Sequence, residues 1–158
     1  MVETERLRIY PISADKLREV IDKETDAEMK QAYSEMLQGC LDSPDKYIWY
    51  TLWFMELKTP GKEIAGDLCF KGIDEIGTVE IGYGLYEGFK KKGYMTEAVK
   101  AMAEWASKQP GVTKVEAEAE ESNIASIKVL ERCGFVLNGE IGEEGPRFTW
   151  HADINMGK

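Results

Sequence analysis

The segment from Leu85 to Ala98 constrains the fold more than any other part of the sequence. It joins a predicted strand, Thr78–Leu85, to a predicted helix, Thr96–Lys108, through a basic turn. The turn holds three consecutive lysines, Lys90–Lys92, followed by Gly93. Free N–H groups and the positive end of the helix dipole make such a helix start an anion site. A solvated charged turn is the alternative interpretation. A Walker A phosphate loop is excluded, because Gly93 is not followed by Lys-Ser or Lys-Thr.

The other segments predict a mixed α/β domain that covers residues 1–158 without a linker. Further strands are expected over Arg6–Tyr10, Tyr47–Leu57, Glu63–Phe70, Lys114–Glu120, Phe135–Leu137 and Arg147–Ile154. Further helices are expected after the cap residue Ser13, over about Asp26–Leu37 with a stop at Gly39, and over Ile124–Arg132. Gly139–Gly145 is predicted to be a loop, and the two glycines of the strand Thr78–Leu85 predict a bulge or a close approach to the backbone. The alternation of helices and strands in the second half favours a mixed sheet.

Charge and rare residues exclude several classes of function. The chain has 29 acidic and 20 basic residues and a net charge of −9, which disfavours nucleic acid and favours a cationic small molecule or basic peptide end. No apolar stretch reaches membrane-spanning length and the N-terminus lacks the order of a signal peptide, so we expect a cytoplasmic protein. Three scattered cysteines and one histidine, His151, predict neither a metal site nor a hydrolase triad.

A second motif, Asn123–Phe135, follows the basic turn in chain order. It reads Asn-x-x-Ser-x-x-Val-Leu-Glu-x-x-Gly-Phe, and the first motif reads Lys-x-x-Gly-x-Met followed by Thr-Glu-Ala over Lys90–Ala98. Together with the phrases Thr4–Ile9 and Glu80–Tyr83, this ordered set resembles the GNAT acetyltransferase superfamily, most closely its ribosomal-protein N-terminal acetyltransferase-like branch. The resemblance spans nearly the whole chain. It implies a GNAT-like mixed, mostly antiparallel twisted sheet flanked by helices, with acetyl-CoA (coenzyme A) as cofactor.

The resemblance also implies roles for individual positions. The backbone of Leu85 and Tyr86 is expected to pair with the pantetheine arm, and Asn123 and Ser126 are expected to face the thioester end or the pantetheine. Ser126 is then a candidate to protonate the departing thiolate. The pyrophosphate is expected on the backbone of Lys90, Lys91, Lys92, Gly93, Tyr94 and Met95. Lys90 stands where the branch has Arg or Gln, and Met95 where it has Gly or Ala, and we expect neither change to abolish binding because the backbone supplies most contacts.

Acetyl transfer to an amine requires a base, because an alkyl ammonium with a pKa of ~10.4 is mostly charged at neutral pH. Glu80 is the first candidate, since it lies on the strand expected to hold the cofactor and opposite that strand's apolar face. Glu118, on the neighbouring strand, is the second. The alternative for each is an exposed or paired charge. Glu97 is interpreted as structural, because an acidic residue in a first helical turn interacts favourably with the dipole.

The leading hypothesis is an N-acetyltransferase that acts on a protein N-terminus, a polyamine or another small amine by direct attack in a ternary complex. The rival hypothesis is a non-catalytic module that binds an acyl-CoA or a partner protein with the same fold. A nucleotide-binding regulator is a third, but the chain lacks the glycine spacing and acidic ribose partner of a dinucleotide site. A homodimer is expected as a possible assembly, and the sequence does not identify the acceptor amine.

Overall fold

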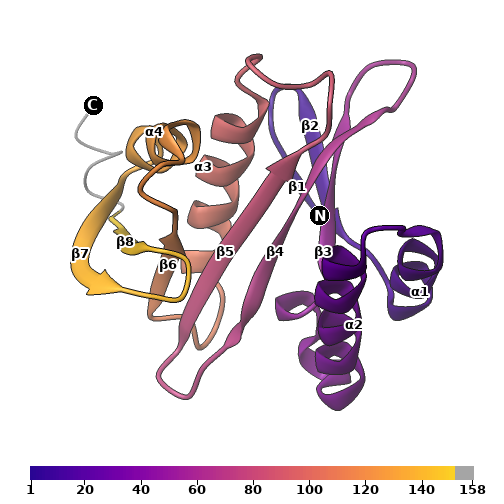
Figure 1. Ribbon diagram of the computed structural model, residues 1–158, viewed down its shortest axis with the longest axis horizontal. Coiled ribbons are helices and arrows are strands. Elements are labelled where there is room, and N and C mark those ends of the chain that lie inside the picture. The colour runs from indigo at the N-terminus through magenta and orange to yellow at the C-terminus, as the bar shows by residue number, and fades with distance from the viewer. Residues whose placement is uncertain (152–158) are drawn as a thin grey trace.

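Eight strands form one continuous sheet in the computed structural model, which describes residues 1–151 (Figure 1). Their spatial order is β1-β2-β3-β4-β5-β6-β8-β7, and every neighbouring pair is antiparallel except the parallel pair β5–β6. The strands are β1 (Val2–Glu3), β2 (Leu7–Pro11), β3 (Leu52–Leu57), β4 (Ile64–Ile73), β5 (Thr78–Leu85), β6 (Lys114–Glu118), β7 (Phe135–Ile141) and β8 (Pro146–Trp150). The predicted mixed, mostly antiparallel sheet flanked by helices is confirmed.

The helices lie in two groups beside the sheet. They are α1 (Ala14–Lys23), α2 (Ala27–Asp42), a 3-10 helix η1 (Pro44–Trp49), α3 (Tyr94–Ser107) and α4 (Ile124–Arg132). The first two lie beside β3, and α3 and α4 lie near β5, β6 and β7 (Figure 1). Ser13 caps α1 by accepting a hydrogen bond from the N–H of Lys16, as the sequence predicts. In the described part of the chain, no helix is both long enough and apolar enough to span a bilayer.

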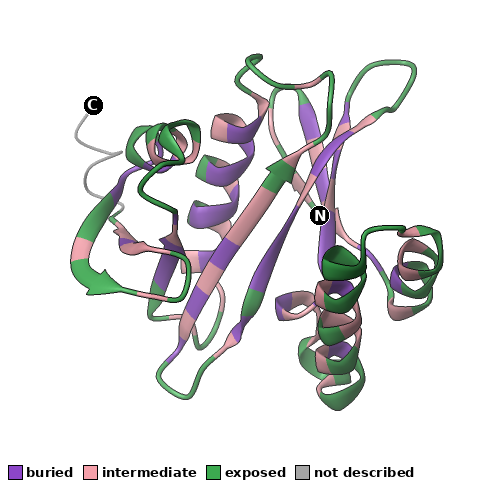
Figure 2. Ribbon diagram, viewed as in Figure 1, coloured by how far each residue is buried: buried purple, intermediate pink, exposed green. Residues whose placement is uncertain are grey.

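An aromatic cluster joins α3 to the strands. The ring of Trp105 lies 5.4 Å from Trp49 and 5.1 Å from Trp53, centroid to centroid, and Phe70 of β4 contacts all three rings. Trp49, Trp53 and Phe70 are buried, and purple patches along β3, β4, β5 and α3 mark the same core in Figure 2. Both tryptophans of the segment 47–57 therefore belong to the core. Rings at these separations add packing energy to their hydrophobic burial.

Several predicted boundaries are wrong, and packing explains the first of them. The helix α2 continues through Gly39, because this glycine makes room for Tyr50, whose ring carbon would lie 2.6 Å from an added Cβ. The single strand predicted over residues 47–57 is η1 followed by β3, with Pro44 at the start of η1. The helix α3 begins at Tyr94, so Met95 is a buried helical residue rather than part of the turn.

The C-terminal region also differs from the prediction. The strand β7 runs from Phe135 to Ile141 and pairs with β8, so the first three residues of the predicted loop 139–145 belong to a strand. The segment 114–120 pairs only as far as Glu118. The strand predicted over residues 147–154 is seen up to Trp150 in β8, and its last residues lie outside the described part of the chain.

The parallel pair β5–β6 is short, and this opens the sheet. Pairing extends from Thr78 with Lys114 to Glu80 with Glu116, and no further pair between these strands forms among the described residues. The strand β5 continues to Leu85 with only β4 at its side. Peptide groups on the other edge of β5 are therefore available to a ligand.

The close approach of β4 to the free end of β5 depends on Gly66. A Cβ added there would clash with the backbone oxygen of Gly84 and lie 3.0 Å from the Cα of Leu85. We expect Gly66→Ala to lower the free energy of unfolding by about 1–3 kcal/mol, because backbone cannot yield as a flexible side chain can. Urea denaturation followed by tryptophan fluorescence measures the change. Gly61→Ala, whose Cβ meets nothing closer than Glu63 Cγ at 3.8 Å, is the matched control. Equal stability of the two variants would contradict this account of the strand packing.

Candidate active site

Two cavities open on opposite sides of the free end of β5. The first, called the basic cavity, has a volume of about 670 Å³. It is lined by Tyr83, Gly84, Leu85, Lys90, Lys91, Gly93, Met95, Thr96, Asn123, Ile124, Ala125, Ser126, Lys128, Val129 and Arg132. The second, called the acidic cavity, has a volume of about 550 Å³. It is lined by Met29, Tyr33, Met36, Leu52, Asp67, Cys69, Lys71, Ile81, Gly82, Tyr83, Gly84, Glu118, Ala119, Glu120, Asn123, Ser126 and Glu144. Tyr83, Gly84, Asn123 and Ser126 line both.

The basic cavity contains most of the residues predicted to bind the cofactor. Those in its wall are Leu85, Lys90, Lys91, Gly93, Met95, Asn123 and Ser126. Three others, Tyr86, Lys92 and Tyr94, do not line it. Lys128 and Arg132 of α4 add two cations that the sequence prediction missed, and none of the described acidic side chains lines the cavity. Their spacing of four residues on a helix was the available signal, because it places both on one face.

The turn before α3 presents unpaired donors to this cavity. Gly93 has φ of 79°, a left-handed conformation that glycine adopts without strain, and it is the N-cap residue of α3. No side chain caps the helix, so the N–H groups of its first turn stay open to an anion. The predicted anion site thus has the required local geometry.

Arg6, which directly precedes β2, holds this turn in place. Its guanidinium donates to the backbone oxygen of Lys92 at 2.9 Å and lies 4.5 Å from the centre of the Tyr94 ring. The Nε of Arg6 also pairs with Glu97 Oε1 at 2.7 Å. The sequence prediction did not give Arg6 a role, and only the fold brings it to a turn so distant in the chain.

Glu97 is structural, as the sequence predicts. Its carboxylate accepts hydrogen bonds from the hydroxyl of Thr4 and the backbone N–H of Arg6, besides the guanidinium. Burial alone raises the pKa of Glu97, but the hydrogen bonds from Thr4 and Arg6 outweigh burial and hold the pKa below its ordinary value. The residue therefore links the N-terminal segment to the first turn of α3 as an anion.

The free edge of β5 presents the peptide groups of Tyr83 and Leu85. Tyr86 donates its N–H to the backbone oxygen of Ala65 at 2.8 Å, on the β4 side. Because N–H groups alternate between the two edges of a strand, those of Tyr83 and Leu85 point to the edge that β6 has left. Of the two residues predicted to pair with a pantetheine arm, Leu85 has the free N–H and Tyr86 does not.

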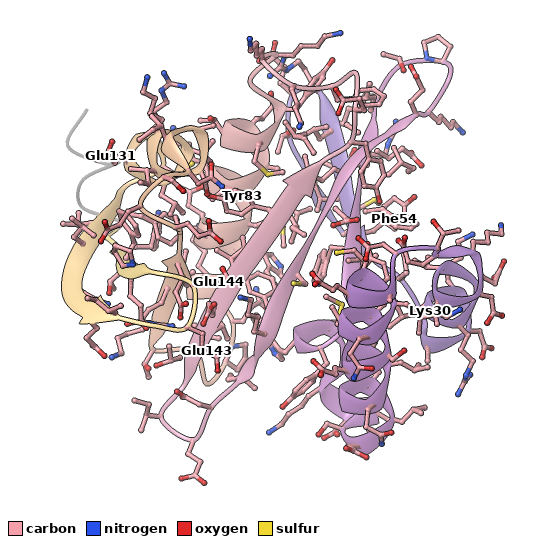
Figure 3. The ribbon with its side chains drawn as sticks, in the orientation of Figure 1. Lys30, Phe54, Tyr83, Glu131, Glu143 and Glu144 are labelled. Carbon is pink, nitrogen blue, oxygen red and sulfur yellow. The ribbon has the colours of Figure 1, made fainter. Side chains whose placement is uncertain are left out.

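A pair of hydroxyl groups lies where the two cavities meet. The hydroxyl oxygen of Tyr83 is 2.9 Å from Oγ of Ser126, and Figure 3 shows the Tyr83 side chain between β5 and α4. Burial raises the pKa of Tyr83 to about 12, and the hydrogen bond between Tyr83 and Ser126 opposes this effect only in part. Tyr83 therefore carries its proton at neutral pH and can donate it to Ser126. Asn123 accepts a hydrogen bond from the N–H of Ser126 at 3.1 Å and so caps α4.

Both carboxylates predicted as the base have cationic partners. Glu80 lines neither cavity and pairs with Lys71 at 2.9 Å and with Arg147 at 3.0 Å. Glu118 lines the acidic cavity, but its carboxylate is bound by Arg147 and by the N–H of Glu144. Each carboxylate is thus held in an ion pair with the Arg147 guanidinium. The role of either residue as base stays a prediction, and the ion pairs with Arg147 argue against it.

Asp67 is one of three acids of the acidic cavity, with Glu120 and Glu144, to which the sequence prediction gave no role. It lies on β4, half-buried, and accepts a hydrogen bond from the Tyr86 hydroxyl at 2.7 Å. Burial raises the pKa of Asp67, and the hydrogen bond from Tyr86 lowers it to a smaller extent. An ionisable residue inside the largely apolar run Ile64–Phe70 was the available sequence signal. Among residues 1–151, no group of three or more His, Cys, Asp or Glu side chains is arranged to hold a metal ion.

Comparisons with known proteins agree with this geometry. Residues 6–136 match the family described as acetyltransferase (GNAT) domain. The chain is 36% identical over 88 residues to the uncharacterized N-acetyltransferase YjdG of Bacillus subtilis, an alignment that covers 55% of this chain and 52% of the relative. The chain thus spans about half the length of the curated relative it matches.

Solved structures share the fold over nearly the full chain. A chimera of the Vibrio cholerae spermidine N-acetyltransferase SpeG and hSSAT superposes with a TM-score of 0.72 at 16% identity, covering 96% of this chain and 99% of that chain. RimL, a ribosomal L7/L12 alpha-N-protein acetyltransferase in complex with coenzyme A, superposes with a TM-score of 0.69 at 17% identity, covering 92% and 94%. At these identities the likeness establishes the fold.

The hydrogen bonds of Glu97 predict a pH-dependent contribution to stability. A carboxylate with a lowered folded-state pKa stabilises the fold above its unfolded-state pKa, near the ordinary value of 4.5, and loses that effect as the pH falls through the folded-state value. We expect Glu97→Gln to lower the free energy of unfolding by about 1–3 kcal/mol at pH 7, and by progressively less below pH ~4.5. Urea denaturation across this pH range tests it. Glu104→Gln, an exposed acid of the same helix, is the control, and a pH-independent difference for Glu97→Gln would refute the assignment.

Proposed function

Because the chain belongs to the acetyltransferase (GNAT) domain family, we propose that it transfers the acetyl group of acetyl-CoA to a primary amine in a ternary complex. The observation that carries the proposal is the meeting of two cavities of opposite charge at Tyr83, Gly84, Asn123 and Ser126. An anionic cofactor and a cationic acceptor would enter from opposite sides of β5 and meet there. Direct attack in a ternary complex needs this arrangement.

The basic cavity fits coenzyme A in two respects. Lys90, Lys91, Lys128 and Arg132, with the open N–H groups at the start of α3, match the charge of the phosphates. The free edge of β5 at Tyr83 and Leu85 offers the peptide groups that an extended chain of amides pairs with. When bound, acetyl-CoA supplies the activated acetyl group.

The residues at the junction would then handle protons. Ser126 would give its hydroxyl proton to the departing thiolate, and Tyr83, 2.9 Å away, would restore that proton. The N–H of Leu85 or Tyr83 would donate a hydrogen bond to the thioester carbonyl, in the manner of an oxyanion hole. Each of these roles extends the sequence prediction for Ser126 and Leu85.

The acceptor would be a cationic amine. Among the described residues, four acids and one cation, Lys71, line the acidic cavity. The acids are Asp67, Glu118, Glu120 and Glu144. Such a field attracts a protein N-terminus, a polyamine or another small amine before the amine loses its proton. The structural neighbours include enzymes named for spermidine and for a ribosomal protein, so both kinds of acceptor occur on this fold.

The cofactor half of the proposal is tested by calorimetric titration with acetyl-CoA, with ATP and NAD as controls. We expect acetyl-CoA to bind and Gly93→Asp to weaken it at least tenfold, that is by about 1.4 kcal/mol or more, because the substitution adds a negative charge to the wall of the basic cavity. Gly88→Asp is the matched control: Gly88 has φ of 93° in the same loop but does not line the basic cavity. Equal loss of affinity in both variants, or no binding by the wild-type chain, would contradict the assignment.

The catalytic half is tested by Ser126→Ala, with butylamine as acceptor and release of free thiol as the measured rate. We expect kcat to fall by about 10²-fold or more, since a positioned proton donor contributes that much, while the affinity for acetyl-CoA stays within about twofold. Ser122→Ala, an exposed serine beside α4, should leave the rate unchanged. Acetyl-CoA binding without any thiol release by the wild-type chain would favour the rival hypothesis, a non-catalytic acyl-CoA-binding module.

A further inference from the structure

Asp67 lies directly beside the junction of the two cavities. Its Cα pairs with that of Gly84 across β4 and β5, and Cys69 pairs with Gly82 in the same way. Side chains of paired residues point to the same face of a sheet. A Cβ added at Gly84 would meet no atom within 4 Å, so this face is open beside Asp67, whereas one added at Gly82 would lie 3.4 Å from Cε of Lys71. The carboxylate of Asp67 therefore borders open space next to Gly84, which lines both cavities.

The charge of Asp67 has no cationic partner within the described part of the chain. Its one hydrogen-bond donor there is the hydroxyl of Tyr86, at 2.7 Å, and no Lys or Arg nitrogen lies within ion-pair distance. Two other acids of the cavity do have cationic partners. Glu118 pairs with Arg147, and Glu144 pairs with Lys71 at 3.4 Å. Glu120 is exposed.

The groups facing Asp67 cannot neutralise it. Burial raises the pKa of the Tyr33 phenol on α2 to about 12, and the charge of Asp67 is the second-largest cause of this rise. Burial also raises the pKa of Tyr86. Both phenols are therefore neutral at pH 7. The remaining charged group that acts on Asp67 is the carboxylate of Glu24, which raises its pKa further. A partly desolvated carboxylate in this setting is stabilised by a cation from outside the chain.

The walls of the cavity specify what kind of cation fits. Met29 and Met36 of α2, with Leu52 of β3, form an apolar side next to Asp67. Unbranched thioether side chains adapt to flexible apolar ligands. The combination suits a primary ammonium group carried on an alkyl chain.

We propose that Asp67 is the site that binds the acceptor's ammonium group and takes its first proton, with Tyr86 as the positioning residue for the carboxylate. This inference rests on the proposed function and names the acceptor class as a primary alkylammonium. The step balances: one N–H bond of the ammonium breaks and its proton goes to Oδ of Asp67. The freed lone pair of nitrogen forms the N–C bond to the acetyl carbonyl as the C–S bond breaks. The nitrogen then loses a second proton, and this loss balances the proton that the thiolate receives from Ser126.

A binding experiment tests the site without any turnover. The probes are butylammonium and its uncharged analogue 1-butanol, titrated at pH 7.5 into protein saturated with coenzyme A and followed by NMR. We expect the wild-type chain to bind butylammonium at least about tenfold more tightly than 1-butanol. Asp67→Asn, which still accepts the hydrogen bond from Tyr86, should remove this preference. Glu104→Gln, which removes one exposed charge from a residue that lines neither cavity, should keep it.

The same variants separate this inference from the proposed function. Asp67→Asn should lower kcat/KM for butylamine at least about 100-fold while its affinity for coenzyme A stays that of the wild type, which also shows that the variant folds. Wild-type activity of Asp67→Asn, or no preference for butylammonium in the wild-type chain, would overturn the role of Asp67 and leave the acetyltransferase proposal standing. Butylammonium binding at Asp67 without any affinity for acetyl-CoA would overturn the proposed function alone.

Discussion

The divergence of β5 from β6 is the constraint on which the rest of the site depends. Pairing of the two parallel strands stops at Glu80 and Glu116, and the last part of β5 keeps a free edge. Arg147 of β8 forms ion pairs there with Glu80 of β5 and with Glu116 and Glu118 of β6. One guanidinium thus ties three strands together at the base of the opening. Its planar fork suits this task, since it donates in several directions at once.

Opposite charges are sorted onto the two sides of that opening. The chain as a whole is acidic, yet the cavity beside α3 and α4 is lined by cations and the cavity beside α2 by acids. The low-dielectric walls of each cavity strengthen its own field. Arg6 contributes indirectly, because it fixes the backbone of the basic turn through Lys92 while Glu97 anchors Arg6.

Local patterns predicted most of the elements, and packing explains the exceptions. Alternation identified the strand Thr78–Leu85 with its correct bounds, and the cap residue Ser13 identified one helix start. Gly39 was misread as a helix stop, because a glycine that admits a neighbouring ring looks the same in sequence as one that ends a helix. Glu80 and Glu118 were read as candidate bases from their strand positions, but their partner Arg147 lies on a third strand, which local pattern does not reveal.

The sequence by itself determined the family, the mixed sheet and the basic glycine-containing turn before α3, since each follows from residues that are neighbours in the chain. The tertiary structure decided which strand edge is free, which carboxylates are neutralised, and how Tyr83 meets Ser126 and Asp67 meets Tyr86. Those features depend on contacts between segments far apart in the chain. Burial and charge compensation are properties of the folded surroundings, so the same aspartate or glutamate can be an anchor or a binding group according to what the fold places beside it.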